Sequence, residues 1–343
     1  MRDSYDVVVV GGGAAGLSGA LALARARRSV LVVDAGAPRN APATAMHNYL
    51  GRDGTPPADL LAAGRAEIAG YGGELLAAEA VAARSGAEGF VVELADAREV
   101  RSRRLLVTTG LVDELPDVPG VGELWGRDVL HCPYCHGWEV RDQAVGVLAT
   151  GPLAVHQALM WRQWSADVTL LLHTGPEPSA QEREQLDARG VRVVRGQVAR
   201  LQLLDGRLHG VRLTGGEVVG CSALVVAPRF TARSSVLASL GLLALEQELD
   251  GHVYGSAVPS DASGATAVPG VWVAGNVTDL RAQVATSAAA GLTAGVAINA
   301  DLIAEDARRA VEARRAAPFS ASAERGVRAG AGRPAPRSLR SHG

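Results

Sequence analysis

The sequence predicts an α/β protein in which one strand–helix–strand unit is inserted into another. An apolar strand, a glycine-rich turn and a helix occur first near residues 5–25. The same order returns near residues 144–173, and a third strand-to-glycine turn begins near residue 271. Strands that alternate with helices are typical of a mostly parallel sheet covered by helices. The length of 343 residues is sufficient for two such domains.

The first unit carries a phosphate-binding turn. Residues 7–10 are consecutive valines, as expected of a parallel strand buried on both faces. Gly11, Gly13 and Gly16 then match G-x-G-x-x-G. In this motif the first glycine makes the tight turn, the second admits a pyrophosphate and the third lets the helix pack on the strand. The next strand ends at Asp34, where an acid is expected to bind a ribose hydroxyl. The pattern predicts a dinucleotide site for FAD or NAD.

The segment from Val271 to Asp279 favours FAD. It resembles the V-x-A-x-G-D segment of flavoproteins with two dinucleotide domains, which returns to the first domain beside the flavin's ribityl-phosphate side. Gly275 keeps the glycine, whereas Asn276 stands where the acid is expected. An amide can still hydrogen-bond a ribityl hydroxyl or a phosphate. The resemblance therefore implies FAD in the first domain.

Prolines and glycines after residue 115 mark a crossing between domains. We expect residues 1–116 to form the first part of an FAD-binding domain and residues 117–247 an inserted Rossmann-like domain. Residues 248–307 would then complete the FAD domain. From residue 308 the sequence is Ala, Arg, Gly, Ser and Pro with few large apolar residues, which predicts a flexible tail.

Composition excludes several classes of partner. The net charge of -2, from 34 basic and 36 acidic side chains, gives no reason to expect nucleic acid. Residues 282–300 are uncharged but rich in Gly, Ser, Thr, Gln and Asn, so we expect no membrane span. The first strand begins near Tyr5, which leaves no room for an export signal. We expect a cytoplasmic protein, whose cysteines stay reduced unless they do redox chemistry.

Residues 131–136 read HCPYCH, which is compatible with three chemistries. Cys-x-x-Cys-His is a haem-attachment string, but attachment needs export. The two histidines and two cysteines could bind zinc, yet four ligands within six residues can hardly surround one tetrahedral ion. A redox-active disulfide beside a flavin fits the rest of the chain best. Pro133 suits the first turn of a helix, which would put Cys132 at its N-terminus and lower the thiol pKa. Cys221 is expected to be a small core residue.

An FAD cradle, an inserted Rossmann unit and a C-x-x-C before it resemble the low-molecular-weight thioredoxin reductases over residues 5–305. The string C-P-Y-C-H-G is most similar to the related dithiol oxidases of the gliotoxin and holomycin type. The resemblance implies that Cys132 exchanges with substrate and Cys135 faces the flavin. His136 stands where true thioredoxin reductases usually have an aspartate. Because the unperturbed pKa of histidine is about 6.5, we expect it to carry protons for the leaving thiols, with capping or packing as the alternative. It also implies a homodimer and, as partner, a small dithiol or a thioredoxin-like protein. The expected FAD contacts are Gly11, Gly13, Ala14, Ala15, Gly16, Asp34, Gly275, Asn276, Gln283 and Val284.

The inserted domain departs from a working NADPH site. Its glycine motif begins with Ala149, and Pro152 removes a backbone N–H near the expected pyrophosphate. No arginine cluster follows the next strand, although Arg183 or Arg195 could replace it. NADPH is therefore doubtful. We expect a dithiol oxidase that uses dioxygen, with an NADPH-dependent thioredoxin reductase and a non-catalytic flavin redox sensor as alternatives.

Overall fold

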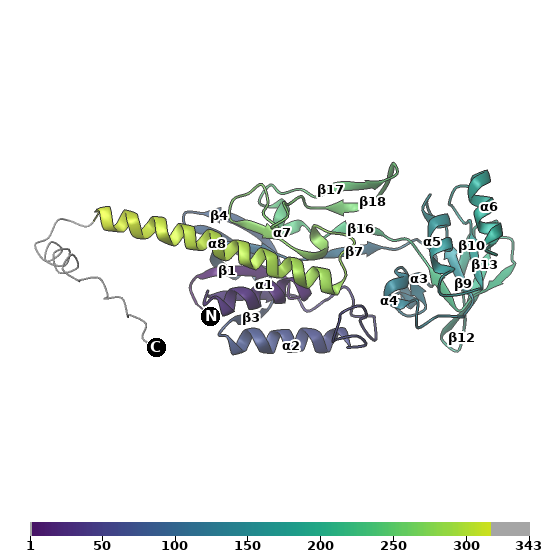
Figure 1. Cartoon of the computed structure of the whole chain (residues 1–343), viewed down its shortest axis with the longest axis horizontal. Helices are drawn as coiled ribbons and strands as arrows, with labels where there is room; N and C mark the ends of the chain where they lie inside the picture. The colour runs from purple at the N-terminus through teal and green to yellow at the C-terminus, as the bar shows by residue number, and fades with distance from the viewer. Residues whose placement is uncertain (1, 317–343) are drawn as a thin grey trace, which may run out of the picture. The chain divides into compact units, whose positions relative to one another are not determined.

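The computed structural model describes residues 2–316 (Figure 1). The first domain is built on a mixed sheet in the order β3-β2-β1-β6-β5-β4, with β19 beside β6. The strands that pair around β1 are parallel, and β4–β5–β6 are antiparallel. Their bounds are β1 Tyr5–Val10, β2 Val30–Asp34, β3 Glu74–Ala77, β4 Ala80–Gly86, β5 Gly89–Leu94, β6 Glu99–Val107 and β19 Val271–Val273. The helices of this domain are α1 Ala14–Arg25, α2 Pro57–Gly70 and α8 Val284–Ala316.

The inserted domain has a parallel sheet in the order β11-β10-β9-β15-β8 and a small antiparallel sheet β12-β13-β14. Two apolar clusters fill it, and their members run from Val118 to Val226. The strands are β8 Val129–Leu130, β9 Val145–Leu148, β10 Val168–Leu171, β11 Arg192–Val194, β12 Val198–Leu204, β13 Arg207–Leu213, β14 Val218–Gly220 and β15 Ala223–Val225. The helices are α3 Val121–Leu124, α4 Pro133–His136, α5 Ala154–Trp161 and α6 Ala180–Ala188.

A fourth sheet, in the order β17-β18-β16-β7, carries the chain out of the first domain and back into it. The chain leaves through β7 (Leu111–Glu114) and returns through β16 (Arg229–Ala232), which pairs antiparallel with β7. We call β7 and β16 the crossing strands. The remaining elements here are α7 Ser235–Ala238, β17 Leu245–Leu249, β18 His252–Ala257 and the 3-10 turn η1 Gly275–Val277.

The chain returns to the first domain earlier in the sequence than the expected boundary at residue 247. Leu237 and Leu242 are buried in the same apolar cluster as Val8 of β1. The return therefore begins with β16, and residues 229–247 belong with the first domain. The sequence pattern misses this boundary because β16 is short and its role depends on pairing with a strand more than a hundred residues earlier.

Helix α8 lies against α1 at glycines on both helices (Figure 1). A Cβ at Gly291 would lie 1.9 Å from the carbonyl oxygen of Ala15, and one at Gly295 would lie 2.8 Å from that of Gly19. By length and composition α8 could span a bilayer, which our reading of residues 282–300 had not allowed. The close contact with α1 accounts for its small apolar residues within the first domain.

The expected flexible tail does not begin at residue 308. Helix α8 continues to Ala316, and Arg309 pairs with Glu305 one turn earlier at 2.5 Å. Alanine, arginine and glutamate are strong helix formers, a preference that our composition argument overlooked. The remainder of the predicted tail, residues 317–343, lies outside the described residues.

Gly291→Ala is predicted to destabilise the protein, although the same change in a helix with free space is normally stabilising by up to about 1 kcal/mol. The added methyl group would clash with the α1 backbone, and such overpacking costs on the order of 1–3 kcal/mol. Thermal unfolding of the purified variant measures the change.

The matched control is Gly70→Ala at the end of α2, where a Cβ would meet nothing within 4 Å. This variant should melt at or slightly above the wild-type temperature. Equal melting temperatures for the two variants would contradict the close contact of α8 with α1.

Candidate active site

The glycine turn between β1 and α1 has the geometry of a phosphate cradle. Gly11 has a φ of +103°, and a Cβ there would lie 2.6 Å from the carbonyl oxygen of Thr108. A Cβ at Gly16 would lie 1.9 Å from the carbonyl oxygen of Gly11, so helix and turn can approach only without a side chain. At Gly13 a Cβ would meet nothing within 4 Å. The open side of the turn thus faces a cavity, as the approach of a phosphate requires.

Asp34 closes the same turn from β2. Its Oδ1 accepts a hydrogen bond from the Gly12 backbone N–H at 3.0 Å. Asp34 also lines the cavity, so its other oxygen is free to bind a ribose hydroxyl. The carboxylate therefore has two uses, since it shapes the turn and presents an acceptor to the ligand.

One cavity of about 860 Å³ joins the cradle to the cysteine pair. Its volume lies at the upper end of the range of ligand sites, as a dinucleotide requires. The N-termini of α1 and α8 both open on it, and a helix N-terminus favours phosphate. Of the residues predicted to bind FAD, those that line it are Gly11, Gly13, Ala14, Ala15, Asp34, Gly275, Asn276, Gln283 and Val284, whereas Gly16 packs behind the turn.

Asn276 has less freedom than its residue type allows. Its Nδ2 donates to the carbonyl oxygens of Asp279 at 3.0 Å and Ala282 at 2.9 Å. Its Oδ1 accepts from Arg39 at 3.2 Å. Both amide hydrogens are therefore used within the protein, so the expected donation to a phosphate is wrong. Only Oδ1 retains a lone pair, which suits a ribityl hydroxyl.

The cysteine pair begins the short helix α4, as Pro133 predicted. Cys132 is the N-cap residue and Pro133 the first helical residue. The pKa of Cys132 is lowered to about 7, first because the Cys135 thiol donates a hydrogen bond to it, and also because the backbone N–H groups of Cys135 and Tyr134 and the charge of Arg39 favour the thiolate. Donation to Cys132, together with burial, raises the pKa of Cys135. In the reduced pair, Cys132 is therefore the thiol that ionises first, with its midpoint near neutral pH.

His136 and His131 flank the pair but have different surroundings. Burial lowers the pKa of His136, against the opposing charge of Glu139, so the ring is neutral at neutral pH and can accept a proton. His131 turns away, with its Nδ1 3.2 Å from the carbonyl oxygen of Val226 and its ring edge-on to Phe230. Within residues 2–316 no three His, Cys, Asp or Glu side chains come together as a metal site would need.

Cys221 is a core residue, as expected. Its side chain is buried in one of the two apolar clusters of the inserted domain. Burial raises the pKa of its thiol to about 12. Such a thiol is unreactive near neutral pH, which leaves the exchange chemistry to Cys132 and Cys135.

The sequence and the fold match a known family of proteins. The model of the pyridine nucleotide-disulphide oxidoreductase family matches residues 5–291. The chain belongs to this family. A curated relative is "Thioredoxin reductase tcpT" of Claviceps purpurea (strain 20.1), 33% identical over 88% of this chain and 95% of the relative. The solved structure of HlmI is 47% identical, covers 92% of this chain and 99% of its own, and has a TM-score of 0.85. The putative thioredoxin reductase TrxB of Bacillus anthracis is 26% identical over 88% of this chain and 99% of its own, with a TM-score of 0.81.

Family membership and geometry together establish the class of the enzyme. It is a flavoprotein disulfide oxidoreductase with two Rossmann-like domains, and its cofactor is FAD. The residues present fit this cofactor, because the cradle has the open face and the acid that a dinucleotide needs and the cavity continues to the cysteine pair.

Sequence reasoning missed the residues that hold the cysteine helix. A loop of residues 46–55 after β2 reaches α4, where Asn48 Nδ2 donates to the carbonyl oxygen of Tyr134 at 2.6 Å. His47 Nε2 lies 3.4 Å from Glu139. Arg39, from the same connection, lines the cavity. These contacts are tertiary, and no motif in the sequence signals them.

Gly13→Asp is predicted to lower FAD affinity by at least about tenfold, or 1.4 kcal/mol. The new carboxylate would project into the open face of the cradle and repel the pyrophosphate. FAD content of the purified protein and titration of the apoprotein measure the loss. The control is Gly215→Asp, in a turn of the inserted domain. A Cβ at this position also meets nothing within 4 Å. Wild-type affinity in Gly13→Asp would refute the position of the cradle.

In the reduced protein Cys132 should be alkylated with a midpoint near pH 7, below the ordinary thiol pKa of about 8.5. Because the pKa is lowered, the thiolate predominates above this midpoint and reactivity is lost as the pH falls through it. Iodoacetamide labelling followed by peptide mass spectrometry, across a pH series, gives the profile. Cys221 provides the internal reference and should react only in alkaline solution. A Cys132 midpoint at the ordinary value would contradict the described environment.

Proposed function

We propose that this flavoenzyme oxidises a dithiol to a disulfide through Cys132 and Cys135, with dioxygen as the final acceptor. The observation that carries the proposal is the state of the second nucleotide site. In the inserted domain the loop after β10 folds onto the expected glycine turn, because the backbone N–H groups of Thr174 and Gly175 both donate to the carbonyl oxygen of Ala149. The carbonyl oxygen of Ala149, which stands in place of the motif's first glycine, is thereby covered by this loop, and this supports a turn that is not open to a phosphate.

The other features of this region support the same conclusion. An added Cβ at Gly151 would lie 3.0 Å from His252 Nε2, so a side chain from β18 covers the turn. Arg195 makes a bidentate pair with Glu177 at 2.9 and 3.0 Å, and Arg183 donates to the carbonyl oxygen of Pro178. Neither arginine is thus a free replacement for the missing clamp on a 2′-phosphate. NADPH has no prepared site.

The proposed reaction is thiol–disulfide exchange. His136 removes the proton from a substrate thiol, and the resulting thiolate attacks Cys132 Sγ of the enzyme disulfide. The bond between Cys132 and Cys135 breaks, and Cys135 leaves with the electron pair as a thiolate. The second substrate thiol, also deprotonated, attacks the substrate sulfur of the mixed disulfide, and Cys132 leaves as a thiolate. Bound FAD supplies the route by which the two electrons pass from the enzyme dithiol to dioxygen, which becomes hydrogen peroxide.

The residues are suited to these steps. Cys132, whose pKa is about 7, is a good leaving group in the second exchange near neutral pH. His136 is buried and neutral, so it accepts a proton and releases it readily. We further propose that the enzyme is a cytoplasmic homodimer, on the strength of the resemblance to thioredoxin reductases. Size-exclusion chromatography with light scattering tests the dimer.

An NADPH-dependent thioredoxin reductase is the second candidate, favoured by relatives such as thioredoxin reductase tcpT. The two functions differ in the source of electrons. The oxidase needs only a dithiol and dioxygen, whereas the reductase needs NADPH to enter the inserted domain. The same experiment therefore separates them.

Anaerobic mixing with NADPH or NADH should leave the flavin oxidised on the timescale of turnover, whereas a small dithiol should bleach it. The physical reason is the loop that covers the carbonyl oxygen of Ala149, together with the absent phosphate clamp. Readmitted dioxygen should restore the yellow colour and yield hydrogen peroxide. Stopped-flow absorbance records both phases.

Cysteine variants provide the controls. Cys132→Ser and Cys135→Ser should each abolish turnover of the dithiol, whereas Cys221→Ser should retain it. Rapid bleaching at micromolar NADPH would replace the oxidase by the reductase. Full turnover in both Cys132→Ser and Cys135→Ser would overturn the exchange mechanism, and no turnover of any dithiol in the wild type would favour a redox sensor.

A further inference from the structure

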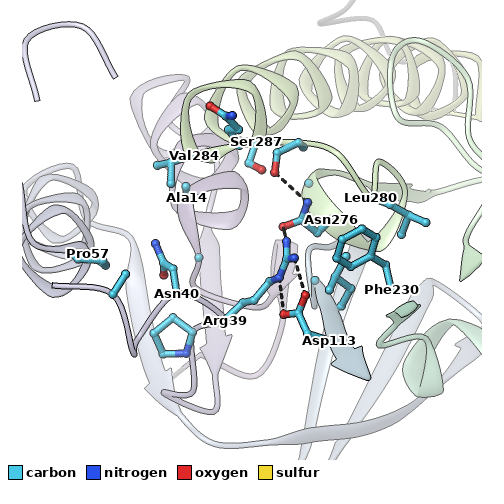
Figure 2. Close-up of a pocket in the computed structure, with 18 of the residues that line it drawn as sticks. Ala14, Arg39, Asn40, Pro57, Asp113, Phe230, Asn276, Leu280, Val284 and Ser287 are labelled. Atoms are coloured by element: carbon cyan, nitrogen blue, oxygen red, sulfur yellow. Dashed lines mark hydrogen bonds and ion pairs between the residues drawn. The ribbon is translucent and has the colours of Figure 1, made fainter. Parts of the chain in front are cut away.

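Arg39 joins four segments of the chain that are far apart in the sequence (Figure 2). Its Nε and Nη2 donate to the two oxygens of Asp113, on crossing strand β7, at 2.8 and 2.6 Å. Its Nη1 donates to Asn276 at 3.2 Å, and its guanidinium lies 5.2 Å from the ring centre of Phe230, on crossing strand β16. We call Arg39, Asp113, Phe230 and Asn276 the Arg39 cluster.

The cluster is protected from solvent. The side chain of Asp113 is 7% exposed and that of Arg39 is 30% exposed. Bidentate arginine–carboxylate pairs are geometrically specific, and removing one partner from a buried pair leaves an uncompensated charge. The pair therefore holds β7 firmly to the connection after β2, while the stacking on Phe230 adds β16.

The cluster also faces the cysteine pair. Arg39, Cys132 and Cys135 line the same cavity. Phe230 contacts the ring of His131, the residue before Cys132, at 5.1 Å between ring centres. The positive charge of Arg39 favours the thiolate form of both cysteines. It adds to the hydrogen bonds that lower the pKa of Cys132, and it opposes the hydrogen bond and the burial that raise the pKa of Cys135.

We propose that Arg39 is a positioning residue for thiol–disulfide exchange, one that ties both crossing strands to the FAD domain and holds a positive charge at the cysteine pair. The proposal rests on the exchange roles proposed above for Cys132 and Cys135. In the first exchange the disulfide breaks and Cys135 receives the electron pair, so negative charge develops on its sulfur. A fixed cation favours that charge and makes Cys135 a better leaving group.

The other groups that face Cys132 are the Cys135 thiol and the backbone N–H groups on α4, and the amide of Gln283, whose Nε2 lies 3.9 Å from Cys132 Sγ. His131 and His136 flank it, and the pKa of each is lowered mainly by burial, so both are neutral at neutral pH. Arg39 is thus the charged group that shifts the Cys132 thiol, and Asp113 is the anion that balances it.

This balance gives two variants with opposite effects. Arg39→Met removes the cation and should move the Cys132 alkylation midpoint upward by at least about half a pH unit. Asp113→Asn removes the balancing anion but keeps the cation, so the midpoint should move downward. Arg39→Lys retains the charge without the bidentate fork and should keep the midpoint near the wild-type value. Labelling of the reduced protein across a pH series, with mass spectrometry at Cys132, gives each midpoint.

Exchange kinetics supply the second measurement. Rapid mixing of the oxidised enzyme with a small dithiol should show mixed-disulfide formation slowed by at least about threefold in Arg39→Met, through a poorer leaving thiol. The loss should appear in kcat and not in KM. The matched control is Arg98→Met, which removes an exposed pair with Asp96 in the β5–β6 turn and should change neither midpoint nor rate.

Opposite shifts in Arg39→Met and Asp113→Asn support the proposal, because mere loosening of the strands would move both midpoints in the same direction. Equal midpoints in all variants, or shifts of one sign, would overturn it. If Arg39→Met does not fold, a wild-type midpoint in Arg39→Lys together with a lower midpoint in Asp113→Asn supports the proposal, and any other pattern in these two variants overturns it. Failure of the exchange mechanism can be distinguished from failure of the Arg39 proposal. The former would appear as dithiol turnover by Cys132→Ser, and the latter as alkylation midpoints of the Arg39 and Asp113 variants that do not shift as expected.

Discussion

The antiparallel pairing of β7 with β16 is the contact on which the arrangement of the active site depends. The cradle belongs to one domain and the cysteine pair to another, and only these two strands connect them along the chain. Because the strands pair with each other, the exit and the return of the chain become a single structural unit. Arg39 then fixes that unit through Asp113 and Phe230, and Asn276 brings the segment before α8 into the same cluster. One charged side chain therefore contacts both crossing strands and the segment before α8.

Within that cavity the chemistry follows from how charge is shared between neighbouring groups. The two thiols share a hydrogen bond, so stabilisation of one thiolate comes at the expense of the other, and Cys132 is favoured because it caps α4. Burial keeps His136 neutral although it is next to the pair. A neutral base beside a thiolate can take up protons without adding a second permanent charge to a poorly hydrated site. The cation at Arg39 is already balanced by Asp113, so it can favour thiolates without leaving the cavity with a large net charge.

The extent to which the sequence predicted this structure reflects how local each feature is. The cradle was predictable because the spacing of Gly11, Gly13 and Gly16 within one turn signals it, although the close contact at Gly11 is with the distant Thr108. Pro133 likewise marks the start of α4 by its place in the sequence. The Arg39 cluster was not predictable, since its four members come together only in the tertiary structure. The same reason explains the misplaced return of the chain, which depends on pairing of β16 with a distant strand. The role of Asn276 was predictable only in part. The residue type shows that its side chain can donate and accept hydrogen bonds, but not that the carbonyl oxygens of Asp279 and Ala282 accept both of its amide hydrogens.

The closed second nucleotide site changes what the inserted domain has to do. A domain that admits a nicotinamide must expose its glycine turn, whereas here Ala149 accepts backbone hydrogen bonds from the following loop and His252 covers Gly151. If electrons enter only from the dithiol, as proposed, the domain serves chiefly to carry α4 to the cavity. The segment that carries the cysteine pair is also tied to the first domain, through the contacts of Asn48 with Tyr134 and of His47 with Glu139. Each of these contacts would have to break if the cysteine pair moved away from the flavin to admit another reductant. If the dithiol is the electron donor, as proposed, a closed nucleotide site and a firmly attached cysteine pair are both consistent with it.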